Sequence, residues 1–190
     1  MESIELYHKY LKGNHWEKHP TIYADEFVDF LNKNNLNGKV LDTGCGTGKD
    51  SNVFYQRGFD IIGVDKSNEE IEKAKQKYPQ IKFEVQDIEN MRFKDNEIDA
   101  IFCINVIHYV KKEKAIKEFL RILKPKGFLY IHFNIEIKDK DGNIDYSQKE
   151  EDILKLIKEF RIIKKEIINR TDTVPIEHYH KFIKLILQKK

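Results

Sequence analysis

Three glycines at alternate positions follow a short apolar run at residues 40–48, VLDTGCGTG. Glycine has no Cβ, so a turn built from alternating glycines lets the backbone approach a ligand closely. The following residues, 49–57, have a helical pattern, and the first turn of a helix offers free N–H groups. The segment therefore predicts a strand, a glycine loop and a helix, with a ligand bound where the strand ends.

The spacing of the loop separates the ligand classes that use such turns. A dinucleotide-binding loop has the pattern GxGxxG, but Lys49 stands where its third glycine would be. A phosphate-binding P-loop fails at both ends, where Thr43 and Asp50 stand. The acid Asp42 would repel phosphate and suits a cationic ligand such as S-adenosylmethionine, which carries an ammonium and a sulfonium. A glycine-rich turn without a ligand is the alternative.

Strand-like and helix-like segments alternate along the chain, which favours an α/β fold with a parallel sheet covered on both faces. The last two strand-like segments have no helix between them and suggest an antiparallel strand at one edge. We expect one domain over residues 1–190, with residues 1–36 as an N-terminal helical segment. Strands are expected at 39–42, 60–65, 81–85, 99–104, 128–133, 161–168 and 179–187, and helices at 49–57, 67–77 (capped by Ser67), 111–123 and 150–160.

Ligands of such sheets bind at the carboxyl ends of the strands, near the point where the strand order reverses. This rule selects the loops at 43–48, 65–67, 86–90 and 105–110. Asp65 ends the second expected strand, 23 residues after Asp42. A carboxylate there can accept hydrogen bonds from both ribose hydroxyls of an adenosine ligand. Its other interpretation is a helix cap.

With these motifs in order, the segment from Val40 to Ile131 resembles the class I S-adenosylmethionine-dependent methyltransferases of the broad small-molecule type. The resemblance implies a Rossmann-like, doubly wound, seven-stranded and mostly parallel sheet with an antiparallel last strand. The charged turn and strand at 172–190 is similar to tellurite- and thiol-type methyltransferases. The similar segments are 41–48, 63–67, 86–88, 101–109 and 121–127, where Lys126 replaces a usual glycine.

The resemblance also implies which residues bind S-adenosylmethionine. The glycines would line its methionine part, with Asp42 near the amino group, Asp65 on the ribose and Asp87 on the adenine N6. An N-terminal lid would add two aromatic contacts, although aromatics there suit a core equally well. The complete set is Tyr10, Trp16, Asp42, Gly44, Cys45, Gly46, Gly48, Asp65, Lys66, Gln86, Asp87, Ile88 and Asn105.

Methyl transfer from a sulfonium mainly requires alignment of the reacting groups. A base is needed only where the acceptor must lose a proton. His108, just past the fourth expected strand, is the candidate base, although packing at a helix start explains it as well. His178 and His180 share one strand face and are acceptor-site candidates. His15 and His19 are spaced i, i+4, but no third ligand is evident, so no metal is expected.

Composition limits the partners of the chain. The 34 Lys and Arg nearly balance 32 Asp and Glu, so the net charge of +2 gives no reason to expect nucleic-acid or membrane binding. Two distant cysteines and a polar start predict a cytoplasmic protein without disulfides or a signal peptide. A small-molecule acceptor is favoured. The alternatives are RNA such as tRNA, a non-catalytic S-adenosylmethionine-binding subunit, and a nicotinamide oxidoreductase. The chain would be a monomer or a homodimer.

Overall fold

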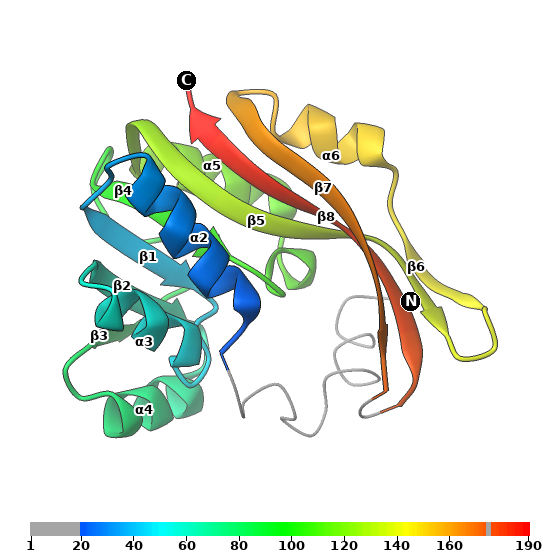
Figure 1. Cartoon of the computed structure of the whole chain (residues 1–190), viewed down its shortest axis with the longest axis horizontal. Helices are drawn as coiled ribbons and strands as arrows, with labels where there is room; N and C mark the ends of the chain where they lie inside the picture. Colours follow the sequence, from blue (N-terminus) through cyan, green and yellow to red (C-terminus); the bar gives the residue numbers. More distant parts are fainter. Residues whose placement is uncertain (1–19, 174–175) are drawn as a thin grey trace.

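The protein forms a mixed sheet flanked by helices, as the computed structural model shows for residues 20–173 and 176–190 (Figure 1). Its strands are β1 (Lys39–Thr43), β2 (Asp60–Asp65), β3 (Lys82–Val85), β4 (Ile98–Cys103), β5 (Leu123–Asp139), β6 (Ile144–Ser147), β7 (Phe160–Asp172) and β8 (His178–Lys189). Its helices are α2 (Ile22–Lys33), α3 (Lys49–Gln56), α4 (Asn68–Lys77), the short 3-10 helix η2 (Ile107–Tyr109), α5 (Lys112–Ile122) and α6 (Glu150–Leu156).

The strand order is β3-β2-β1-β4-β5-β8-β7, and β6 pairs with β5 off this path. Strands β3, β2, β1, β4 and β5 are parallel, whereas β8 is antiparallel to both β5 and β7. The order reverses between β1 and β4, which is where ligands bind in doubly wound sheets. The expected Rossmann-like sheet with an antiparallel last strand is confirmed.

The expectation of an antiparallel strand at the edge is wrong in one respect. The last strand, β8, lies between β5 and β7, and β7 is the edge strand. Their burial explains this arrangement. Residues 182–187 of β8 are all buried, as a strand covered on both faces requires, whereas most of β7 is exposed. Strand β6, which follows a turn at Gly142, was not expected from the sequence.

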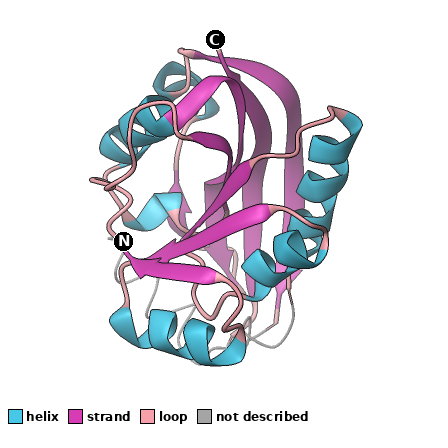
Figure 2. Ribbon diagram, turned by 90° about the vertical axis from the view of Figure 1, so that its left-hand side faces the viewer, coloured by secondary structure: helices cyan, strands magenta, loops and turns pink. Residues whose placement is uncertain are grey.

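Both faces of the sheet carry helices, as Figure 2 shows. Helices α2, α3 and α4 bury apolar side chains in the core on one face, and α5 and α6 do so in the core on the other. Ser67 caps α4 as expected, because its hydroxyl accepts a hydrogen bond from the backbone N–H of Glu70 at 3.3 Å. No helix in the described part of the chain combines the length and the apolar character needed to cross a bilayer.

The described part of the N-terminal segment belongs to the core. Phe27 of α2 is fully buried, with its ring centroid 6.1 Å from that of Phe102 and 5.1 Å from that of Tyr130. Helix α2 therefore packs against the sheet as part of the core and does not act as a lid. Tyr10 and Trp16, which were expected to form a lid, lie outside the described residues.

Candidate functional site

The glycine loop joins β1 to α3 at the carboxyl edge of the sheet. Gly44, Gly46 and Gly48 all have left-handed backbone conformations, with φ of 68°, 51° and 78°. Residues with a Cβ rarely adopt such backbone angles, so each position favours glycine. The loop is held to β2 because the backbone N–H groups of Gly44 and Cys45 both donate to the Val64 carbonyl, at 2.7 and 3.0 Å.

The three glycines differ in what surrounds them. A Cβ at Gly44 would lie 2.1 Å from a methyl of Val106, and one at Gly48 would lie 2.5 Å from the Phe83 ring. At Gly46 the nearest atom among the described residues, apart from its chain neighbours, would be a carboxylate oxygen of Glu70, 4.0 Å away. Gly44 and Gly48 therefore fit the loop onto the protein, whereas Gly46 borders open space in which a ligand can lie against the backbone.

The side chains of Cys45 and Asp42 are both buried. The Cys45 thiol is buried in the core beside Gly63, and burial raises its pKa well above the usual value. Asp42 is 3% exposed and accepts a hydrogen bond of 2.6 Å from the Ser51 hydroxyl. Burial, with the nearby charge of Asp50 second, raises the pKa of Asp42 to about 8. The loop backbone, rather than these side chains, thus forms the surface of the site.

Asp65 stands at the end of β2, next to Gly46. One of its carboxylate oxygens accepts from the Gly46 N–H at 3.1 Å, and the other accepts from the Ser67 N–H at 2.9 Å. These bonds fix the carboxylate between the glycine loop and the start of α4. Each oxygen keeps a second lone pair for a further donor. The geometry suits the recognition of a pair of hydroxyl groups.

Next to Asp65, a hollow of about 250 Å³ is lined by Lys66, Val85, Gln86, Asp87, Asn90 and Arg92. Three of the residues expected on the adenine side therefore surround one space. The side-chain amide of Gln86 already makes hydrogen bonds within the protein. Its nitrogen donates to Glu84 at 2.6 Å, and its oxygen accepts from the backbone N–H of Arg92 at 2.9 Å. The Ile88 side chain lies in the core.

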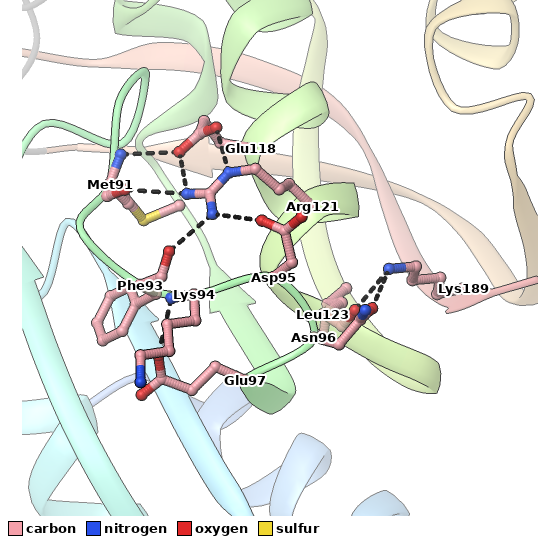
Figure 3. A network of polar contacts seen from close by, with 10 residues as sticks. All are labelled: Met91, Phe93, Lys94, Asp95, Asn96, Glu97, Glu118, Arg121, Leu123 and Lys189. Carbon is pink, nitrogen blue, oxygen red and sulfur yellow. Dashed lines mark hydrogen bonds and ion pairs between the residues drawn. The ribbon is translucent and has the colours of Figure 1, made fainter.

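A polar network behind the hollow supports the loop at residues 91–97 (Figure 3). Arg121 of α5 donates to the carbonyls of Met91 and Phe93 at 2.9 and 2.7 Å. It also pairs with the carboxylates of Glu118 and Asp95, at 2.8 and 3.0 Å, and Glu118 accepts from the Met91 N–H. One guanidinium thus holds Met91, Phe93 and Asp95 of this loop against α5.

Beyond β4, Asn105 is exposed and has a φ of 57°, so its backbone is turned at the carboxyl edge of the sheet. His108 follows in η2 and is 7% exposed. Its Nδ1 is one of three buried side-chain atoms without a hydrogen-bond partner in the described part of the chain. Burial, followed by the charges of His180 and Lys112, lowers the pKa of His108 to about 3. The ring is neutral at neutral pH and is a weak base.

His132 on β5 is a second buried histidine and was not among the residues expected in the site. Its Nε2 is another of those buried atoms without a partner, and burial lowers its pKa to about 3. The ring stacks on Phe182 and meets the edge of Tyr23, with centroids 4.9 and 4.5 Å away. A polar residue within the apolar run at 128–133 was the available signal.

His178 and His180 lie at the start of β8 and share a face with Asp172 of β7. Burial and the neighbouring His178 lower the pKa of His180 to about 4, against the opposing effect of Asp172. The charge of His180 in turn contributes to the low pKa of His108. The acceptor-site candidates of β8 and the candidate base of η2 are thus within electrostatic reach of one another.

Comparisons with known proteins identify a family and several relatives that resemble this chain. Residues 41–131 match the family described as methyltransferase domain. An uncharacterized methyltransferase of Mycobacterium tuberculosis is 31% identical over 119 residues, covering 63% of this chain and 49% of that protein. A demethylmenaquinone methyltransferase of Paenarthrobacter aurescens is 36% identical over 94 residues, covering 49% of this chain and 37% of that protein. The chain spans about half the length of the curated relatives it matches.

A solved structure of a SAM-dependent methyltransferase from Methanosarcina mazei has the same fold, with a TM-score of 0.71. It is 20% identical, and the match covers 84% of this chain and 96% of that one. The matched region 41–131 contains the glycine loop, Asp65, the hollow and His108. The described features of the candidate site thus lie mainly within the segment that the family shares.

Proposed function

We propose that this chain is a class I S-adenosylmethionine-dependent methyltransferase that transfers a methyl group to a small-molecule acceptor. The match of residues 41–131 to the methyltransferase-domain family and the shared fold support the proposal. The observation that carries the proposal is the space at Gly46, which has a φ of 51° and, among the described residues other than its chain neighbours, no atom nearer than 4.0 Å to an added Cβ. It adjoins Asp65, whose carboxylate is already held by the Gly46 N–H.

The residues present fit an adenosyl ligand along the carboxyl edge of the sheet. The backbone at Gly46 would hold the amino-acid part, Asp65 would accept from the ribose hydroxyls, and the hollow at Lys66 and Asp87 would hold the adenine. When bound, S-adenosylmethionine would supply a sulfonium-activated methyl group: the acceptor lone pair would bond to the methyl carbon as the methyl–sulfur bond breaks, and S-adenosylhomocysteine would leave. The chain then has to align the acceptor and exclude water.

The proposed acceptor is a small molecule that presents a lone pair at neutral pH. The demethylmenaquinone methyltransferase among the relatives supports a small molecule, as does the net charge of only +2. His108 is a weak base because burial lowers its pKa to about 3. An acceptor such as a thiolate needs no base. It therefore suits a site whose candidate base is weak better than an acceptor that must lose a tightly held proton does. Both cysteines are buried and free, which supports a reducing, cytoplasmic location.

The cofactor is tested by thermal unfolding with S-adenosylmethionine, S-adenosylhomocysteine, NADH or ATP. A ligand at 100 times its dissociation constant stabilises the folded state by about 2.7 kcal/mol. We expect a shift with both adenosyl compounds and a much smaller one in Asp65→Ala. The matched control is Asp60→Ala, at the exposed opposite end of β2, which should leave the shift unchanged. A shift with NADH or ATP alone would overturn the assignment.

The acceptor is tested by following transfer of a labelled methyl group to thiols, amines, phenols and tRNA. We expect transfer to a small molecule, with S-adenosylhomocysteine formed in equal amount. Transfer to tRNA alone would replace the small-molecule proposal with an RNA methyltransferase. Binding of both adenosyl compounds without any transfer would favour a non-catalytic subunit.

A further inference from the structure

The described chain holds one cluster of two histidines and an aspartate, at the end of the β7–β8 hairpin. Asp172 is the last residue of β7 and pairs in register with His178, the first residue of β8. His180 lies two residues along β8 and therefore on the same face of the strand. Because β8 is antiparallel to β5 and starts beside Asp139, the cluster lies at the carboxyl end of β5 (Figure 1).

We propose that Asp172, His178 and His180 form a binding site for a divalent first-row transition-metal ion such as Zn²⁺. Each residue offers one ligand atom, and these three atoms all lie within 4.8 Å of one another. This metal site does not depend on methyl transfer and can be tested without it.

The distances in the cluster are somewhat longer than those between ligand atoms of a shared ion. The Asp172 Oδ2 lies 3.6 Å from the His180 Nε2 and 3.9 Å from the His178 Nε2. Both distances are longer than a hydrogen bond between nitrogen and oxygen. Two ligand atoms that each lie about 2.1 Å from one tetrahedral ion are roughly 3.4 Å apart. Small side-chain movements therefore bring all three atoms to a common centre.

The surroundings of His178 select the ligand atom. Its Nδ1 lies 2.7 Å from the Ile176 carbonyl, which can only accept, so the Nδ1 carries the proton and the Nε2 presents its lone pair. Metal-bound histidines commonly donate their second nitrogen to a carbonyl in this way. The ring is also 2% exposed, so its orientation is fixed by packing.

The donor set indicates the class of ion. Two imidazole nitrogens with one carboxylate oxygen suit zinc, iron, cobalt, nickel or copper, whereas magnesium and calcium prefer oxygen ligands. Three protein ligands leave at least one coordination position for water or another small ligand.

Arg170 competes for the same carboxylate. Its Nη2 lies 2.7 Å from the Asp172 Oδ2, the atom that faces both histidines. The Arg170 side chain is 41% exposed and its guanidinium lies 5.7 Å from the centre of the Phe182 ring. Arg170 can therefore swing into solvent when an ion binds, and its presence lowers the affinity of the site for the ion.

The test uses the full chain without a histidine tag, stripped of metal with a chelator. Titration with Co²⁺, followed by visible absorption, and with Zn²⁺, followed by calorimetry, should each show one equivalent bound. We expect Asp172→Asn and His180→Asn to weaken Zn²⁺ binding at least tenfold. Arg170→Gln should tighten it several-fold, an effect that loss of an ordinary surface charge pair would not produce. Circular dichroism and the thermal midpoint establish that each variant is folded.

The matched control replaces the other spaced pair, His15→Gln with His19→Gln, both outside the described residues. This double variant should bind Zn²⁺ like the unmodified chain. Loss of binding there, with Asp172→Asn unaffected, would overturn the proposal, as would the absence of a bound equivalent in the unmodified chain. Unchanged or weaker binding in Arg170→Gln would also contradict the arrangement.

Discussion

Residues of one type play different parts in the glycine loop. Gly44, Gly46 and Gly48 have similar left-handed conformations, yet only Gly46 borders open space. The side chain of Val106 fills the space at Gly44, and Phe83 fills it at Gly48. Gly44 and Gly48 thus act mainly through packing, whereas Gly46 acts through what it leaves accessible to a ligand.

Replacing these glycines separates packing from binding. Gly46→Ala should cost about 1–2 kcal/mol of stability through its left-handed backbone and lower the affinity for S-adenosylhomocysteine at least tenfold. Gly44→Ala adds a clash with Val106 and should cost on the order of 3 kcal/mol or more. Urea unfolding and calorimetry measure both effects. Equal losses of stability, or unchanged affinity in Gly46→Ala, would contradict this division.

Asp42 shows how burial changes what an acid can do. From the sequence alone, Asp42 is expected to be a negative charge that attracts a cation. In the structure the carboxyl is 3% exposed and its pKa is raised to about 8, mainly by burial. It is therefore largely protonated at neutral pH and accepts from Ser51. An approaching cation would favour its ionised form.

This carboxyl predicts a pH dependence of stability. The unfolded chain releases the proton near pH 4, and the folded chain holds it until about pH 8. Between these values the folded state binds more protons, so stability should fall as the pH rises. Asp42→Asn keeps an acceptor for Ser51 and should be more stable at pH 8 by on the order of 3 kcal/mol. Urea unfolding from pH 5 to pH 8 measures this; a parallel pH dependence in both proteins would contradict it.

At the scale of elements, helix α5 holds the loop at residues 91–97, which contributes Arg92 to the hollow. Arg121 on α5 supplies the donors for the carbonyls of Met91 and Phe93, and Glu118 accepts from the Met91 N–H. The side chain of Arg121 is 30% exposed, and that of Glu118 is 15% exposed. Carbonyl groups that are left without a hydrogen-bond donor in a partly buried position lower the stability of the folded protein.

We therefore expect Arg121→Met to lower the free energy of unfolding by about 2–4 kcal/mol. The control is Arg92→Met in the same region, whose side chain is 70% exposed and which should change stability by less than about 0.5 kcal/mol. Chemical denaturation measures both variants. Similar small effects in the two would show that the network of Figure 3 contributes little to stability.

At the scale of the whole molecule, one sheet separates two apolar cores. Phe27 lies in the core under α2, α3 and α4, and Phe119 lies in the core under α5 and α6. Both side chains are fully buried. Neighbouring residues of one strand serve opposite cores, as Leu129 and Tyr130 of β5 do. The two cores should therefore form and unfold together.

Phe27→Ala and Phe119→Ala test this coupling. Each should cost about 3–5 kcal/mol through lost burial and the cavity left behind. Each should also shift the same single transition, with far-ultraviolet and near-ultraviolet circular dichroism changing together. A second transition in one variant only would show that the two faces unfold as separate units.

The sequence by itself determined most of the parallel half of the sheet and which loops lie together at the carboxyl edge of its strands. Alternation of apolar runs with helical patterns depends on local periodicity, so β1 to β4 and their helices were found within a residue or two. The glycine spacing, Asp65 and the segment at Lys66 and Gln86 follow strand ends, which parallel strands bring to one edge. Short-range patterns are sufficient for such features.

Tertiary structure alone decided what depends on pairing and burial. It placed β8 between β5 and β7, because strand order depends on which strand can be covered on both faces. It turned Cys45 into the core and made Asp42 a largely protonated acid, since burial depends on neighbours distant in sequence. It also brought Asp172 to His178 and His180. No spacing in the sequence shows that cluster, because register across a hairpin is set by packing of the whole sheet.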